Sequence, residues 1–168
     1  KVLRVGGEMY FSDVYCDRRL PKHVQQHDVL FGECISGALY IEDFKRICHK
    51  VGFNDPRMIS IHPIRIADDE LVDVVGEAKF YSITYRLFKL PNLEQGPCED
   101  YGQIAIYRGT LPGNPNSYTL GDHHHFEKGK PTPVCGNTAS MLSETWLRPH
   151  FDVAGSREVH YGIFGAHG

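Results

Sequence analysis

The order of apolar patterns between residues 8 and 90 is the feature that most constrains the fold. Stretches with the alternation and the aromatic or β-branched content of strands are interleaved with stretches of helical spacing. The predicted elements are a strand at 8–14, helices at 20–30 and 38–53, a strand at 57–67 interrupted at Pro63, a short acidic helix at 67–77 and a strand at 79–90. This alternation is typical of an α/β sheet. Because residues 1–7 resemble the end of an earlier element and its turn, we expect the second half of such a sheet.

Residue types at three helix ends support these assignments. Pro21 suits the first turn of the helix at 20–30. Gly52 follows a lysine-containing last turn, as a C-terminal cap does. Asp68 or Asp69 is the expected N-cap of the acidic helix.

The residue composition changes at Pro91, where a polar stretch with prolines and a glycine begins. We therefore place a domain boundary there, with a small α+β domain at 91–168. Its predicted elements are strands at 101–111 and 117–129 joined by the turn 112–116, a helix at 137–151 with Asn137 as N-cap, and two final strands around a Gly-Ser turn.

Composition excludes several classes of function. The chain has 168 residues, of which 41% are hydrophobic and 23% charged, with a net charge of -3. The basic residues are scattered, so nucleic acid is not an expected partner. No apolar run reaches the length of a membrane span and no signal peptide is recognisable, so we expect a cytoplasmic protein without membrane contact. The five cysteines are an odd number without a CxxC pair, which argues against a disulfide framework and against zinc-finger spacing.

The first residue is Lys1 and the sequence opens inside an element, so we expect a fragment whose N-terminal part is missing. Asp13 is predicted near the carboxyl end of the first strand. Ligands of open α/β sheets collect at that edge, which makes Asp13 a candidate cofactor contact. Bonding to nearby backbone groups explains an aspartate there equally well.

Cys34 is the candidate site residue of greatest interest. It lies in the string FGECISGALY between Gly32 and Gly37, which suggests a sharp bend or a close approach of the backbone. A cysteine here is either a ligand for a soft ion or a small buried side chain. Glu33 could orient a bound hydroxyl, or it is an exposed acid at a helix end. Tyr40 and Tyr15 are candidates to line a pocket or to pack in the core.

Three consecutive histidines, 123–125, invite a metal hypothesis. Neighbouring residues on a strand point to opposite faces, so only His123 and His125 could share an ion. Cys135 follows ten residues later and could complete a soft-metal site with them across a hairpin. A solvent-facing polar strand is the more ordinary interpretation.

Three strings together resemble a known family: GGEMYFSDVY, FGECISGALYIEDF and KFYSITYRLFK. In this order they are similar to the arsenite methyltransferases, enzymes with a class I Rossmann-like fold that use S-adenosylmethionine. The resemblance covers residues 1–90 well and the remainder more loosely. It implies that 1–90 is the C-terminal part of the catalytic, acceptor-binding domain and that 91–168 is the small C-terminal domain.

The resemblance also implies roles. In that family As(III) is held by thiolates, one of which is the cysteine of GEC, here Cys34. Soft, thiophilic arsenic prefers sulfur donors to oxygen donors. Arsenite, alone or complexed with thiols, is thus the expected substrate, and a small thiol reductant a further partner.

The sequence departs from the family in two respects. Family members carry another thiol in the stretch that matches 78–83, where this chain has no cysteine, so a substitute such as Cys135, Cys98 or Cys48 would be needed. Most of the S-adenosylmethionine site belongs upstream of Lys1, so the isolated chain is expected to be inactive. Two alternatives stay open: a binding or sensor protein without turnover, and a methyltransferase for a small organic acceptor.

Overall fold

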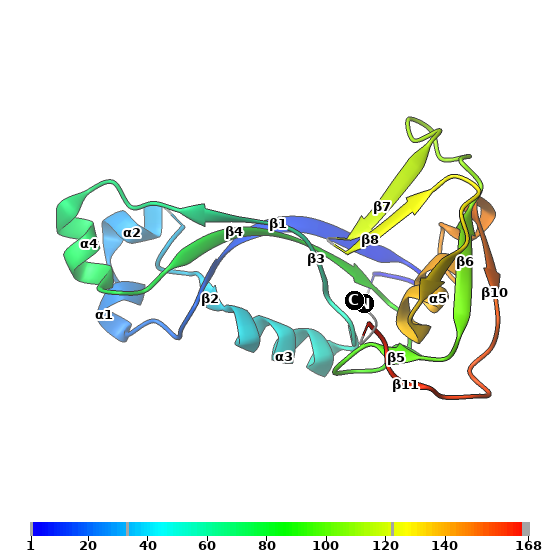
Figure 1. Ribbon diagram of the computed structural model, residues 1–168. Coiled ribbons are helices and arrows are strands. Elements are labelled where there is room, and N and C mark those ends of the chain that lie inside the picture. Colours follow the sequence, from blue (N-terminus) through cyan, green and yellow to red (C-terminus); the bar gives the residue numbers. More distant parts are fainter. Residues whose placement is uncertain (1, 33, 122, 166–168) are drawn as a thin grey trace.

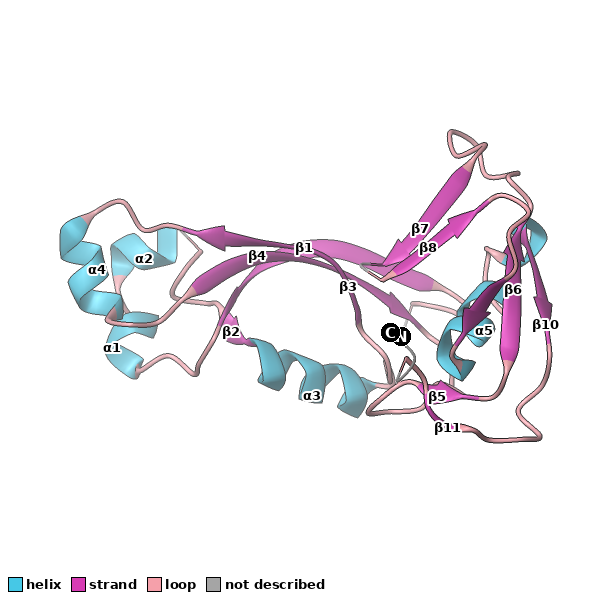
Figure 2. Cartoon of the chain, in the orientation of Figure 1, coloured by secondary structure: helices cyan, strands magenta, loops and turns pink. Residues whose placement is uncertain are grey.

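The computed structural model describes residues 2–32, 34–121 and 123–165. Figures 1 and 2 show an elongated molecule in which a long curved sheet joins helices at one end to a small second half at the other. The first part contains β1 (Glu8–Cys16), α1 (Lys22–Gln25), α2 (Asp28–Gly32), β2 (Leu39–Tyr40), α3 (Ile41–Val51), β3 (Arg57–Ile64), α4 (Asp69–Val75) and β4 (Phe80–Phe88). The second contains β5 (Glu99–Asp100), β6 (Gln103–Tyr107), β7 (Ser117–Gly121), β8 (His124–Glu127), β9 (Thr132–Val134), α5 (Gly136–Ser143), the 3₁₀ turn η1 (Arg148–His150), β10 (Phe151–Ala154) and β11 (Gly162–Ile163).

The main sheet has the strand order β2-β1-β4-β3. β2 runs parallel to β1, whereas β4 runs antiparallel to both β1 and β3. The predicted interruption at Pro63 is wrong, because Pro63 pairs with Tyr81 inside β3 and the register shift lies between Met58 and Ser60. β3 is an edge strand, where the missing N–H of a proline can face away from the ladder.

The helices of the first part confirm the local signals and correct one length. α3 ends at Gly52, which takes the left-handed conformation with φ 100°, and Asp68 caps α4 by accepting from Glu70 N–H at 2.9 Å. The single helix expected at 20–30 is wrong. The chain forms two short helices there, because the ring Nδ1 of His27 accepts from Leu30 N–H at 3.4 Å and starts α2 anew.

Apolar side chains form three separate clusters. One lies between α1, α2, α4 and the adjoining sheet end, and includes Leu30, Ile35 and Phe80. A second lies between α3 and the sheet, where the rings of Tyr15 and Phe44 are 4.9 Å apart. The third fills the second half from Phe88 to Phe151. The boundary at Pro91 stays a prediction.

The second half differs from its predicted topology. The stretch expected as one strand, 117–129, is the β7–β8 hairpin, in which Tyr118 pairs with Phe126 and both rings approach Phe151. β6 pairs instead with β9 and β10. The two last strands do not pair with each other either, because β10 joins β6 and β11 joins β5.

α5 corrects another expectation, since Cys135 and not Asn137 is its N-cap, with the Cys135 sulfur accepting from Thr138 N–H at 3.4 Å. The helix ends at Ser143, well before the predicted 151. The Thr145 hydroxyl donates to Met141 C=O and accepts from Leu147 N–H, so it supplies local bonds that replace a further helical turn.

A buried ion pair lies in the main sheet, and its arginine also bonds to the second half of the molecule. Arg86 on β4 donates to both carboxylate oxygens of Glu8 at 2.9 and 3.0 Å, and their side chains are 3% and 10% exposed. The same guanidinium donates to the Tyr118 hydroxyl and to Leu120 C=O on β7. The sheet and the β7–β8 hairpin therefore share one buried positive charge.

We expect Glu8→Gln to lower the free energy of unfolding by about 3–5 kcal/mol, because it leaves the Arg86 charge buried without its counter-charge. Urea unfolding measures the change. Lys130→Ala, which removes an exposed ion pair with Glu127, is the control and should unfold like the wild type. A Glu8→Gln protein as stable as this control would show that the ion pair contributes nothing.

Candidate functional site

Cys34 makes the turn that ends α2. It has a left-handed backbone with φ 61°, the one described residue other than glycine with a positive φ. Its N–H donates to Phe31 C=O at 3.1 Å, and Ile35 N–H donates to Leu30 C=O at 2.9 Å. These are the two bonds of a Schellman motif, in which glycine usually takes the left-handed position. A left-handed backbone costs a residue with a Cβ about 1–2 kcal/mol.

The flanking glycines do not make the bend. Neither Gly32 nor Gly37 has a positive φ, and a Cβ added to either would meet open space. The expected close backbone approach at these glycines is therefore wrong. Cys34 itself carries the strain, and strained residues cluster at functional sites.

The thiol of Cys34 is exposed, although the backbone beside it is anchored in the core. Leu30 and Ile35, whose backbone groups form the turn, are 0% and 3% exposed and belong to the cluster that contains Phe80. This anchoring fixes the backbone of an exposed cysteine. Sequence reasoning missed Ser36, which is 4% exposed and whose hydroxyl has no hydrogen-bond partner among the described residues.

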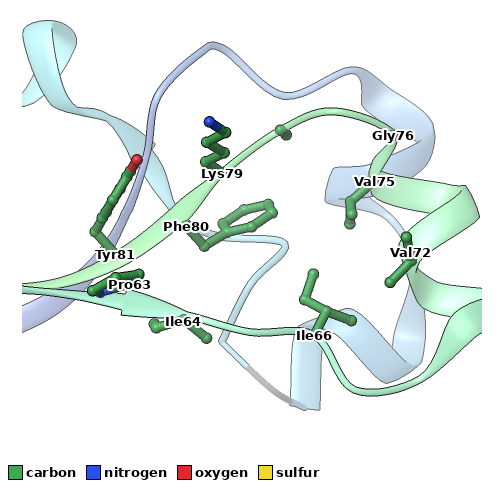
Figure 3. A pocket seen from close by; sticks show the side chains of 10 residues that line it. Pro63, Ile64, Ile66, Val72, Val75, Gly76, Lys79, Phe80 and Tyr81 are labelled. Carbon is green, nitrogen blue, oxygen red and sulfur yellow. The ribbon is translucent and has the colours of Figure 1, made fainter.

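Two apolar clefts lie at this end of the sheet, and the first of them adjoins the turn. One of ≈ 310 Å³ lies between Leu30 and Ile35 on one side and the chain after β3 on the other. The second, of ≈ 210 Å³, is lined by Val75, Ala78 and Phe80 and is shown in Figure 3. Ile64 and Ile66 line both clefts. The structure thus brings the Cys34 turn and the segment around Ala78, which are distant in sequence, to one end of the sheet.

The other predicted contacts are placed as follows. Glu33 lies outside the described residues. Tyr40 is half-buried, with the Arg19 guanidinium 5.7 Å from its ring centre.

Asp13 does not lie at the end of its strand, because β1 continues to Cys16 and Asp13 pairs with Ile83. It is exposed and accepts from Val14 N–H at 2.8 Å, which matches the local-bonding interpretation. Tyr15 is buried in the core.

The remaining cysteines do not extend the Cys34 site. Cys16 and Cys48 are 0% and 3% exposed, and burial raises the pKa of both thiols, that of Cys48 to about 11. Cys135 contacts Arg57, the first residue of β3, whereas the cleft beside Cys34 reaches Ile64, its last. At about 3.3 Å per strand residue these ends are roughly 20 Å apart. Neither Cys48 nor Cys135 is therefore placed as the substitute ligand.

The predicted histidine site is rearranged as well. His124 faces the Cys135 region, where its Nε2 lies 3.0 Å from an Arg57 nitrogen. His125 is exposed and pairs with the Thr119 hydroxyl at 2.9 Å. Within residues 2–32, 34–121 and 123–165, no group of three or more His, Cys, Asp or Glu side chains could hold a metal ion.

The described residues do not fit the donor side of a methyl transfer. A nucleotide-type cofactor needs a glycine-rich turn between a strand and a helix, whose N–H groups face the ligand. The loop that joins β1 to α1 and the loop that joins β3 to α4 contain no glycine.

No described helix is long and apolar enough to cross a membrane.

Comparisons with known proteins agree on one group. No protein-family model matches the sequence. An arsenite methyltransferase of Aquipseudomonas alcaligenes is 51% identical over 164 residues, which are 98% of this chain and 47% of that protein. Those of Mus musculus and Homo sapiens are 38% and 37% identical over 90% of this chain. The chain is homologous to part of the arsenite methyltransferases.

A solved structure extends this homology to the fold. The crystal structure of an arsenic(III) S-adenosylmethionine methyltransferase from Chlamydomonas reinhardtii has a TM-score of 0.91 and 59% identity, covering 97% of this chain and 54% of that one. The predicted fold class, the second half of a Rossmann-like methyltransferase sheet followed by α+β structure, is confirmed. The chain spans less than half the length of the curated relatives that it matches.

Exposure predicts which cysteine reacts first. In the native chain at pH 8, iodoacetamide should modify Cys34 well before Cys48, because Cys48 is buried and its pKa of about 11 leaves about one thiol in a thousand ionised. Peptide mapping after short pulses measures the order. In urea both should react at similar rates, and fast native labelling of Cys48 would contradict the structure.

The left-handed backbone of Cys34 predicts that glycine at this position would raise the free energy of unfolding. Cys34→Gly should unfold with a free energy about 1 kcal/mol higher than Cys34→Ala, because glycine adopts a positive φ without a Cβ clash. Both variants lack the thiol, so the comparison isolates the backbone. Equal urea midpoints for the two would show that the turn is not strained.

Proposed function

We propose that the complete protein transfers methyl groups from S-adenosylmethionine to As(III), and that this chain supplies the acceptor side, with Cys34 as an arsenic ligand. The homology to arsenite methyltransferases over 98% of the chain carries the proposal. The geometry of the Cys34 turn supports it, since a strained backbone holds an exposed thiol beside an apolar cleft.

Thiolate ligation suits this acceptor. Arsenic(III) is soft, so a cysteine sulfur outcompetes water for it, whereas a serine oxygen does not. Leu30 and Ile35 fix the backbone on either side of Cys34, which limits the positions that a bound arsenic atom can take. Holding a reactant in one orientation lowers the barrier to its reaction by several kcal/mol.

The coordination of arsenic requires further sulfur donors. The described residues place no second exposed thiol beside Cys34, because Cys16 is buried and Ala78 stands in the stretch where the resemblance implies a cysteine. We propose that arsenite enters already complexed with a small thiol, or that cysteines of the protein outside this chain complete the site. A small thiol would then also serve as reductant.

The donor belongs to another part of the protein. S-adenosylmethionine, when bound there, supplies the methyl group. The role of Asp13 as a cofactor contact stays a prediction, as do the roles of Glu33 and Tyr40 at the substrate. We propose that residues 1–90 form the acceptor-binding part and 91–168 the small C-terminal domain, that the isolated chain is inactive, and that the protein is cytoplasmic.

One observation favours a second candidate, a protein that binds arsenite without turnover. Ala78 packs against the apolar cluster that contains Leu30 and Ile35 of the Cys34 turn, and it stands in the stretch where the resemblance implies a further thiol. Such a protein would retain affinity for As(III) but form no methylated product.

The test is methylation of arsenite by the complete protein and its Cys34→Ser variant. We expect roughly 100-fold slower product formation by the variant, because one donor of a multidentate thiolate site is lost. Chromatography of methylated arsenic species measures the rate, and Cys16→Ala is the matched control because that cysteine is buried. Equal rates for Cys34→Ser and wild type would exclude Cys34 as a ligand, and binding without any product in the wild type would favour the second candidate.

A further inference from the structure

A second pair of thiols lies in the other half of the molecule. Cys135 is the N-cap of α5 and is completely buried, whereas Cys98, which precedes β5, is partly exposed. The strand β5, which follows Cys98, lies against α5, which follows Cys135, and each thiol changes the pKa of the other, although 36 residues separate them in the sequence. Because α5 and α2 lie at opposite ends of the molecule in Figure 1, this pair is distinct from the Cys34 site.

A buried cation faces the pair. One nitrogen of the Arg57 guanidinium lies 3.7 Å from Cys135 Sγ, and another donates to the Thr138 hydroxyl at 3.1 Å. That hydroxyl lies 3.3 Å from the same sulfur. Arg57 is 8% exposed and also pairs with Asp55 at 2.8 Å. The sulfur is thus surrounded by groups that stabilise a negative charge.

These contacts differentiate the two thiols. The proximity of Cys98, together with His124, Arg57 and Thr138, lowers the pKa of Cys135, while the proximity of Cys135 and burial raise the pKa of Cys98. The pair therefore combines a sulfur whose ionised form is favoured with a neighbouring thiol whose protonated form is favoured. A thiolate is the form that ligates soft ions.

A cleft adjoins this cluster. It has a volume of ≈ 350 Å³ and is lined by Asp55 and Pro56, by Gly96 of the loop that leads to Cys98, and by Lys45 and His49 of α3. A small molecule in this cleft would lie next to the carboxylate that holds Arg57. Of the two sulfurs, Cys98 is the partly exposed one.

We propose that Cys98 and Cys135 form a second binding site, for a trivalent arsenical that carries one organic substituent. Such a compound, R–As(OH)₂, has two exchangeable oxygens, and the cluster offers two sulfurs. The described residues contain no group of three or more metal-ligating side chains that could hold a metal ion, so a site of the zinc type is not present there.

The binding step is balanced without any oxidant. Two As–O bonds break and two As–S bonds form, arsenic remains trivalent, and both hydroxyl groups leave as water. Cys98 supplies one proton and, where Cys135 is already ionised, solvent supplies the other. The product is a cyclic dithioarsenite that joins the loop before β5 to the start of α5.

The test uses phenylarsine oxide as the probe, with the complete protein kept reduced. Proteolysis and mass spectrometry should identify one phenylarsenic group that bridges the peptides of Cys98 and Cys135. Cys98→Ser and Cys135→Ser should each lose this bridge and bind the probe at that site roughly 100-fold more weakly, because the second sulfur adds its contribution intramolecularly. Serine at 135 retains a good helix cap, so α5 is expected to stay folded.

Cys34→Ser is the matched control and separates the two proposals. It should keep the bridged adduct even if arsenite methylation is lost. Urea unfolding of each variant shows whether it is folded. A folded wild type that gives no adduct bridging the two peptides, or a Cys98→Ser protein that binds the probe at this site as tightly as wild type, would overturn the second site while leaving the role of Cys34 open.

Discussion

Two buried guanidinium groups lie opposite each other across β3 and β4, and their neutralisation determines how the rest of the molecule packs. Arg57 pairs directly with Arg86 in the register of these strands, and the two are 8% and 3% exposed. Like charges in directly opposed positions repel each other, and more strongly where water is excluded. Each cation therefore requires its own anion: Glu8 for Arg86, and Asp55 together with Cys135 for Arg57.

This charge arrangement links both parts of the chain. Arg86 reaches Tyr118 and Leu120 on β7, and Arg57 reaches Thr138 on α5, so the second half supplies polar groups to cations that are rooted in the main sheet. The same arrangement contributes to the lowered pKa of Cys135, a residue without solvent contact. The neighbouring Cys98 has the largest effect, and the permanent positive charge of Arg57 adds to it, so that together they offset the cost of burial.

At the other end of the sheet the notable feature is the strained turn at Cys34. The backbone of Cys34 adopts a conformation that glycine would adopt at lower cost. The role that we propose for Cys34, a thiolate ligand of arsenic, would account for a cysteine at this position. Retaining a cysteine in a strained turn is the pattern expected where a side chain is needed for chemistry and not for packing.

Local patterns in the sequence were enough to predict α3 with its Gly52 cap, α4 with Asp68 and the strands β1 and β4, and its motifs indicated the arsenite methyltransferases. The strand pairs of the second half, the capping of α5 by Cys135, and the contact of Cys135 with Arg57 depend on the tertiary structure. Helix caps and alternation are set within a few residues, so they can be predicted from local patterns. Contacts between Arg57, Cys98 and Cys135 join segments 41 and 37 residues apart, and no local pattern encodes them, because they follow from how the two buried charges and the apolar clusters are satisfied together.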